Sequence, residues 1–270
     1  MLAQATVAVL LYHSVAPTTT RGFAPWTIDP SLFEEHLAAL REARVQVIPA
    51  REVPEALVRG QHAVAISIDD GLADVVSYAA PTLLRHGLPT ALFVPTAYVG
   101  GRSQWLPGGD GRRPMLSWDD LGELARGGFE IGSHGRLHLA ADVNPVALVR
   151  RDAVASKAEL EDRLGVAVES FAYPFGYQTA QARRAIREAG YAQAFTVGDL
   201  PACGQDDRWA LPRLQVSGRT GADALLAMIR WRPSCAARSW AHAKQDVWRA
   251  GRRLVGWGPE AAGPIGGPGR

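Results

Sequence analysis

The sequence of 270 residues contains only two cysteines, Cys203 and Cys235. Two cysteines cannot form the disulfide framework on which many small secreted domains depend, and they permit a reducing compartment. The fold must therefore be stabilised by an apolar core. A chain of this length with 47% hydrophobic residues can bury a sizeable one.

The sequence also lacks any run of about 18 apolar residues, the length that a transmembrane helix requires. Its N-terminus has no basic segment, and the apolar stretch from Ala5 to Leu11 continues directly into Tyr12 and His13. This is not the pattern of a secretory signal. We therefore expect residues 5–12 to form the first strand and the protein to be cytoplasmic.

There is no large excess of either charge, because the formal net charge is only +2. The charges are unevenly distributed, however. Residues 1–207 carry 18 basic and 24 acidic side chains, whereas residues 208–270 carry 11 and 3. The mildly acidic body argues against binding to nucleic acid.

The basic C-terminal segment predicts a separate tail. From about residue 233 to 254, apolar positions that include Trp240 and Leu254 alternate with arginines at helical spacing. Such a basic amphipathic helix can lie on an anionic membrane, dock a partner or pack on the body. Residues 256–270 are rich in glycine and proline. We expect a main domain over residues 1–232 and a tail over residues 233–270.

The main domain alternates between strand and helix patterns. Strands are predicted at residues 5–12, 45–48, 63–68, 90–94, 129–133, 170–172, 192–196 and 209–216. Helices are predicted at 31–40, 52–59, 73–86, 117–126, 144–164, 179–190 and 221–231. This alternation is typical of a parallel α/β barrel or a doubly wound sheet.

The strand at residues 63–68 leads directly into two adjacent carboxylates, Asp69 and Asp70, followed by Gly71. Ligand sites on parallel sheets lie at the carboxyl ends of the strands. Two neighbouring carboxylates repel each other unless a cation or a proton intervenes. The pair therefore indicates metal-assisted or acid–base chemistry, with a solvated turn as the alternative.

A second strand leads into His134 and His138, which are separated by three residues. Histidines with this spacing can face the same way and bind one metal ion. With a carboxylate they would form a set of three ligands, which leaves positions open for water and substrate. This pair favours the metal interpretation over an Asp-Asp-Gly turn.

Three segments together resemble a known family: Ser-Ile-Asp-Asp-Gly at residues 67–71, Ser-His-Gly-Arg-Leu-His at 133–138 and Ser-Phe-Ala-Tyr-Pro-Phe-Gly at 170–176. They are similar in type, order and spacing to the first three motifs of the polysaccharide deacetylase family, also called the NodB homology or carbohydrate esterase family 4. The resemblance covers about residues 6–217. Leu-Tyr-His-Ser at residues 11–14 resembles the branch with circularly shifted motifs, which includes the poly-N-acetylglucosamine deacetylases.

The resemblance implies a distorted (β/α) barrel of about seven strands with its site at the C-terminal mouth. It also implies a hydrolase that removes N-acetyl groups from an N-acetylated amino sugar in a glycan, a glycolipid or a sugar precursor. Asp70, His134 and His138 would hold one divalent metal ion, with zinc expected first and cobalt, nickel or iron as alternatives. Asp69 would be the general base and His13 the general acid.

In the family, the loop of the third motif lines the site. Tyr173, Pro174 and Phe175 would do so here, with the Phe175 N–H helping to hold the oxyanion. Many relatives have an arginine two residues before the proline, where this sequence has Ala172. Arg213, at the end of a predicted strand, is the best candidate to orient the base in its place, although a surface salt bridge is the commoner role of an arginine.

Residues 98–114 form the longest irregular stretch of the main domain and contain Trp105. Trp105 could stack on a sugar ring or pin the loop to the body. Two other functions remain open: a hydrolase of cyclic amides or ureides, and a catalytically silent glycan-binding protein on the same fold. The sequence does not indicate an oligomeric state.

Overall fold

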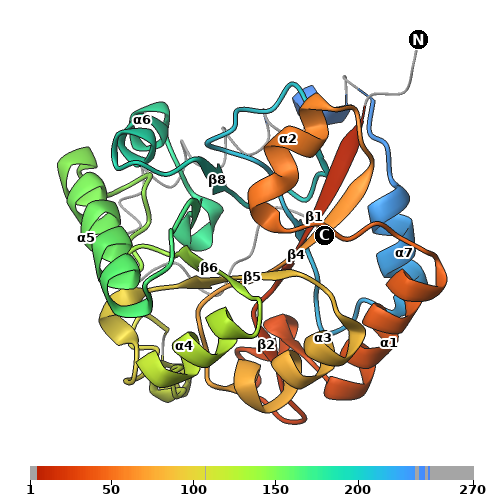
Figure 1. The fold of residues 1–270 in the computed structure, drawn as a ribbon, viewed down its shortest axis with the longest axis horizontal. Helices are drawn as coiled ribbons and strands as arrows, with labels where there is room; N and C mark the ends of the chain where they lie inside the picture. Colours follow the sequence, from red (N-terminus) through yellow and green to blue (C-terminus); the bar gives the residue numbers. More distant parts are fainter. Residues whose placement is uncertain (1–4, 107, 235–236, 241–242, 244–270) are drawn as a thin grey trace.

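The computed structural model describes residues 5–106, 108–234, 237–240 and 243 (Figure 1). Within these residues, seven strands form one sheet in the order β10, β1, β4, β5, β6, β7, β8, and every neighbouring pair is parallel. Their bounds are β1 Thr6–Tyr12, β4 Ala63–Ile68, β5 Thr90–Val94, β6 Glu130–Ser133, β7 Ser170–Ala172, β8 Gln193–Phe195 and β10 Leu214–Gln215.

The sheet curls into the predicted distorted barrel. Leu211 forms a parallel bridge with Phe195 of β8, and β10 follows three residues later to pair with β1. A short antiparallel strand, β9 (Ala202–Cys203), also pairs with β1. The strand β2 (Ser14–Val15) begins two residues after β1 ends. It forms a separate parallel pair with β3 (Thr27–Ile28).

Helices surround the curled sheet. In Figure 1, α6, α5, α4, α3, α1 and α7 follow one another around its periphery. The helices are α1 Pro30–Glu42, α2 Val53–Val58, α3 Ala80–His86, α4 Trp118–Arg126, α5 Val146–Leu164, α6 Ala180–Glu188 and α7 Ala222–Arg230, and a π-helical turn at Val75–Ala79 precedes α3. Among the described residues, none of the helices combines the length and the apolar character that crossing a membrane requires.

Strand periodicity divides the apolar residues between two layers. Val7 and Val9 of β1 and Ala65 of β4 belong to a core inside the barrel, whereas Leu10 of β1 and Ile66 of β4 belong to the larger core beneath the helices. Side chains along a strand point alternately to opposite faces. Because inward-facing residues recur at every second position, the Ala65 face of β4 continues through residue 67 to residue 69 at the barrel mouth.

Two predicted strands are shorter than expected. Residues 45–48 make only a single bridge, between Val47 and Val64, because Pro49 and a 3₁₀ turn at Ala50–Glu52 follow at once. The predicted strand at 209–216 is divided into the Leu211 bridge and β10, with Pro212 between them. Proline lacks the N–H that a sheet hydrogen bond requires.

The predicted tail helix falls largely outside the described residues. Residues 237–240 and 243 are helical, and Arg238 is buried against the barrel. Its guanidinium donates to Asp206 at 2.7 and 2.6 Å and to the Pro201 carbonyl at 2.7 Å. The first part of the tail is therefore held to the barrel by an ion pair.

Candidate metal and catalytic site

The five residues predicted to carry the chemistry lie at one end of the barrel. His13 follows β1, Asp69 and Asp70 follow β4, and His134 and His138 follow β6. Parallel strands bring their carboxyl ends to the same rim. Each of the five has a relative exposure of 5% or less. The site is thus an enclosed cluster of titratable groups beneath the barrel mouth.

Asp70, His134 and His138 form a group with the donor atoms of a metal site. One donor atom from each residue lies within 4.8 Å of the other two. The Asp70 Oδ1 atom is 3.3 Å from Nε2 of His138 and 3.6 Å from Nε2 of His134. One carboxylate oxygen and two imidazole nitrogens converge on a point, as in open catalytic metal sites.

The protonation states also suit a metal ion. Burial lowers the pKa of His134 to about 4 and that of His138 to about 3, so both rings are neutral near pH 7. His134 Nδ1 lies 2.8 Å from the Ala172 carbonyl and must donate to it, which leaves the Nε2 lone pair directed at Asp70. Neutral imidazole is the metal-binding form. A transition metal such as zinc therefore fits these residues.

Asp70 supports the same conclusion. Burial raises the pKa of Asp70 above its ordinary value, against the lowering effects of His13 and His134. A buried carboxylate in such surroundings is poorly stabilised when ionised, and a bound cation reverses that balance. A cation bound by the cluster would therefore stabilise the ionised form of Asp70.

Three residues of the site have left-handed backbone conformations, which are uncommon for residues other than glycine. The φ angles are 74° at Asp70, 54° at His138 and 60° at Phe175. Strain of this kind is maintained only where the surrounding structure imposes it, and it gathers at functional sites. The loops after β4, β6 and β7 are thus held in shapes that direct these residues into the site.

Asp69 has surroundings unlike those of Asp70. Two nitrogens of the fully buried Arg213 donate to its two carboxylate oxygens at 2.7 and 2.6 Å. Burial alone would raise the pKa of Asp69, but the charge and hydrogen bonds of the Arg213 guanidinium outweigh it and hold the pKa below its ordinary value. Asp69 Oδ2 is 3.8 Å from His134 Nε2. An ionised carboxylate therefore lies beside the cluster of Asp70, His134 and His138.

His13 lies within electrostatic reach of both carboxylates. Burial lowers its pKa, while the charges of Asp70 and Asp69 act in the opposite direction. Its Nδ1 atom is buried and has no hydrogen-bond partner among the described residues. A second titratable group, from a different strand, thus joins the site.

The loop of the third motif packs against the cluster. The Tyr173 N–H is bonded to the Phe195 carbonyl, and its hydroxyl donates to the Trp209 carbonyl, so this buried side chain serves the structure. Pro174 has no N–H. The Gly176 N–H donates to the Tyr173 carbonyl at 2.8 Å, and the Phe175 ring meets His138 edge-on at 4.7 Å between ring centroids.

Trp105 lies beside the metal-type cluster. Its ring is stacked on that of His138, with 4.6 Å between centroids and 23° between the planes. Tyr98 packs against it at 4.7 Å. The irregular stretch predicted from the sequence therefore does reach the site, and the partner of Trp105 is a histidine of the second motif.

Two carboxylates near the site, those of Asp152 and Asp74, were not predicted from the sequence. Asp152 of α5 is buried and accepts the backbone N–H groups of Arg136 (2.7 Å) and Leu137 (2.8 Å), between the two histidines of the second motif. Asp74 accepts the hydroxyl of Ser14, the neighbour of His13, at 2.6 Å. One feature of the sequence could have indicated Asp152: it is an acidic residue on the same face of a long predicted helix as Val149 and Ala153, which are buried.

Comparisons with known proteins agree with this geometry. A family model described as polysaccharide deacetylase matches residues 58–194. The Bacillus subtilis (strain 168) protein YxkH, described as a polysaccharide deacetylase, is 22% identical over 229 residues. The match covers 83% of this chain and 76% of that protein.

Solved structures share the fold. The Streptococcus pyogenes deacetylase PplD, in complex with acetate, superposes with a TM-score of 0.75 at 18% identity and covers 84% of this chain and 100% of its own. IcaB from Ammonifex degensii gives a TM-score of 0.71 at 23% identity, with 85% of this chain and 99% of its own covered. A de-N-acetylase from Aggregatibacter actinomycetemcomitans gives 0.69 at 21% identity, covering 82% and 99%.

Proposed function

The chain belongs to the polysaccharide deacetylase family, and from this premise we propose that it is a metal-dependent hydrolase of the acetamide group of an N-acetylated amino sugar. One observation carries the proposal: a cluster of three metal-type donors lies beside an ionised carboxylate that a buried arginine holds in place. A glycan-binding protein would need neither the base nor its arginine.

Asp70, His134 and His138 would hold the metal ion, which when bound would supply Lewis acidity toward a carbonyl and lower the pKa of water. Asp69 accepts the proton of the water molecule that adds to the acetyl carbon, and Arg213 keeps its carboxylate ionised and oriented. The N–H of Phe175 would stabilise the oxyanion.

Breaking the C–N bond requires a proton at the leaving nitrogen, because a free amide anion is a very poor leaving group. In its protonated form, His13 is the group that we assign to this step. Burial lowers its pKa, which makes the imidazolium a stronger acid. The products are acetate and the free amine of the sugar.

The test is acetate release by purified, zinc-loaded protein from N-acetylglucosamine oligomers, measured in parallel with ring opening of cyclic amides. We expect acetate from the oligomers, with loss of both activity and bound metal in His138→Ala. Ring opening without acetate release would favour the hydrolase of cyclic amides or ureides. Binding of the oligomers without either reaction, by metal-loaded protein, would favour a glycan-binding role.

We further propose that the basic tail brings the enzyme to an anionic membrane that carries a lipid-linked substrate. The charge balance of residues 208–270, 11 basic against 3 acidic side chains, supports this proposal together with the tryptophans spaced along the segment.

A further inference from the structure

The two histidines of the metal-type cluster are oriented in different ways. His134 donates from Nδ1 to the Ala172 carbonyl, which fixes its tautomer and ring plane. The Nδ1 atom of His138 is buried and has no hydrogen-bond partner among the described residues. A ligating histidine normally has such a partner on its second nitrogen. Among the described residues, the side-chain contacts that hold the His138 ring are therefore with other rings.

Three rings contact His138, one of which is the His134 imidazole, edge-on at 4.9 Å and 69°. Trp105 stacks on its face at 4.6 Å and 23°, and Phe175 meets it edge-on at 4.7 Å and 80°. Both contacts fall in the range in which paired rings attract one another beyond simple burial. We propose that Trp105 is a positioning residue for the metal ligand His138, fixing its imidazole by stacking where His134 is fixed by a hydrogen bond. This inference rests on the metal site proposed above.

The stacking also bears on the sugar-binding alternative. A sugar ring stacks on an open aromatic face, but one face of Trp105 is covered by His138. Tyr98 packs against the same indole with a tilt of 56°. The indole Nε1 is buried and has no hydrogen-bond partner among the described residues. Trp105 is thus half-buried and packed into the wall of the site.

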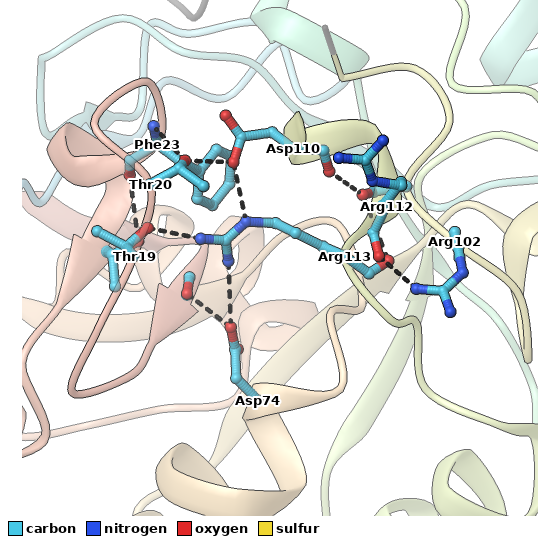
Figure 2. Close-up of polar contacts among 11 residues, drawn as sticks. Thr19, Thr20, Phe23, Asp74, Arg102, Asp110, Arg112 and Arg113 are labelled. Carbon is cyan, nitrogen blue, oxygen red and sulfur yellow. Dashed lines mark hydrogen bonds and ion pairs between the residues drawn. The ribbon is translucent and has the colours of Figure 1, made fainter. Parts of the chain in front are cut away.

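The loop that carries Trp105 is anchored well enough for this task. Figure 2 shows the guanidinium of Arg113 among three side chains of different segments. It donates to Thr19 Oγ1 at 2.5 Å and pairs with Asp110 at 3.4 Å and Asp74 at 3.7 Å. It also lies 4.2 Å from the centroid of the Phe23 ring.

Asp110 provides a second anchor, because it accepts hydrogen bonds from the segment of residues 19–27 and from within its own loop. The Thr20 hydroxyl donates to Asp110, and the Ser103 hydroxyl donates to the Asp110 carbonyl at 2.6 Å. Beneath these contacts, Trp105 packs on a small apolar cluster of Phe23, Trp26, Leu72 and Met115. Because Leu72 follows Asp70 by two residues, the loop is braced against the first motif as well as the second.

The experiment is a titration of metal-free protein with Co²⁺, followed by its visible absorption spectrum, which reports ligand geometry without any substrate. The variants are Trp105→Ala, Trp105→Leu and Trp105→Phe. Trp26→Phe is the matched control, because Trp26 belongs to the same apolar cluster but pairs with Phe23 instead of His138. Thermal unfolding of each metal-free variant verifies that it is folded.

Loss of a group that orients a ligand typically costs 10- to 100-fold in metal affinity. We expect Trp105→Ala and Trp105→Leu to weaken Co²⁺ binding by about tenfold or more and to alter the spectrum, whereas Trp105→Phe recovers most of the affinity and Trp26→Phe matches wild type. If Trp105→Ala or Trp105→Leu is folded and has wild-type affinity and spectrum, the positioning role of Trp105 is wrong, while the metal site itself stands. Wild-type protein that binds no Co²⁺ would overturn the metal site itself.

Discussion

Asp69 and Asp70 are adjacent, yet the protein moves their pKa values in opposite directions. The Arg213 guanidinium holds the pKa of Asp69 low against its burial, while burial raises that of Asp70. Groups with opposite shifts suit different roles. We predict that Asp69→Asn keeps the metal ion and loses roughly 10²–10⁴-fold in turnover, the usual contribution of a positioned base. Metal content and acetate release measure the two effects. Near-normal turnover would remove Asp69 from the mechanism.

His13 is expected to act in its protonated form. Activity that depends on a protonated acid falls as the pH rises through the pKa of that acid. We predict that His13→Asn retains metal, loses most of its turnover and no longer shows the alkaline limb of the profile of kcat/KM against pH. An alkaline limb that persists unchanged in the variant would assign the acid to another group.

Asp74 gives a prediction about stability. Burial raises its pKa from 3.8 to about 6, although the Ser14 hydroxyl and Arg113 oppose the shift. The folded state therefore holds this proton more tightly than the unfolded state, so stability falls as the pH rises from about 4 to 6. A shift of this size corresponds to about 3 kcal/mol.

Asp74→Asn has no such proton to lose. We expect the variant to gain stability relative to wild type between pH 4.5 and pH 7.5, as measured by urea unfolding of both proteins, metal-free, at the two pH values. Equal differences at the two pH values would show that Asp74 does not titrate in this range.

The residues of the site differ in how far sequence could predict them. Five of them follow apolar strand patterns: His13, Asp69, Asp70, His134 and His138. Because the carboxyl ends of parallel strands lie at one rim, the sequence was enough to predict that these residues lie close together. The contact of Arg213 with Asp69 joins residues 144 positions apart, so strand position suggested the arginine but could not give the bidentate geometry. The stacking of Trp105 on His138 arises inside an irregular loop, where no periodicity indicates direction.

At the scale of elements, the loop between His134 and His138 depends on α5. The Asp152 carboxylate accepts the N–H groups of Arg136 and Leu137. A Cβ added to Gly135, whose φ is 74°, would lie 2.5 Å from Asp152 Oδ2. The helix therefore approaches the loop so closely that only glycine fits.

Asp152→Ala would leave two partly buried backbone N–H groups without their acceptor, at up to about 1–3 kcal/mol each. We predict a lower free energy of unfolding and about tenfold weaker metal binding, since both ligands sit in the released loop. Arg150→Ala on the same helix is the control, because its ion pair with Glu188 is largely exposed and such pairs contribute little. Equal effects in the two variants would refute the anchoring role.

Elements were predictable where a strong apolar pattern was uninterrupted. The buried strands β1, β4 and β5 and the helices α5 and α6 agree with their predicted spans to within a few residues. Pairing failed to follow the pattern where proline intervened, as at Pro49 and Pro212, because hydrophobicity predicts burial but not whether a hydrogen-bond donor is present. The antiparallel β9 is two residues long and leaves too short a pattern to detect.

At the scale of the whole molecule, basic side chains are concentrated in the C-terminal segment. Arg238 is committed to Asp206 on the barrel, so it cannot contribute to a membrane surface while that pair is intact. The basic side chains beyond it, at residues 244, 249, 252, 253 and 270, outnumber the acidic ones at 246 and 260. Each basic side chain near an anionic surface contributes about 1 kcal/mol at low salt.

We therefore predict that the full chain sediments with vesicles containing anionic lipid at low salt, and that binding falls steeply as salt is raised because the Debye length shrinks. Vesicles of neutral lipid should retain little protein. A chain ending at residue 243 keeps the Arg238 anchor and should lose binding while acetate release from soluble oligomers stays unchanged. If the full chain fails to bind anionic vesicles at low salt, the basic segment serves to pack on the barrel or to dock a protein partner instead.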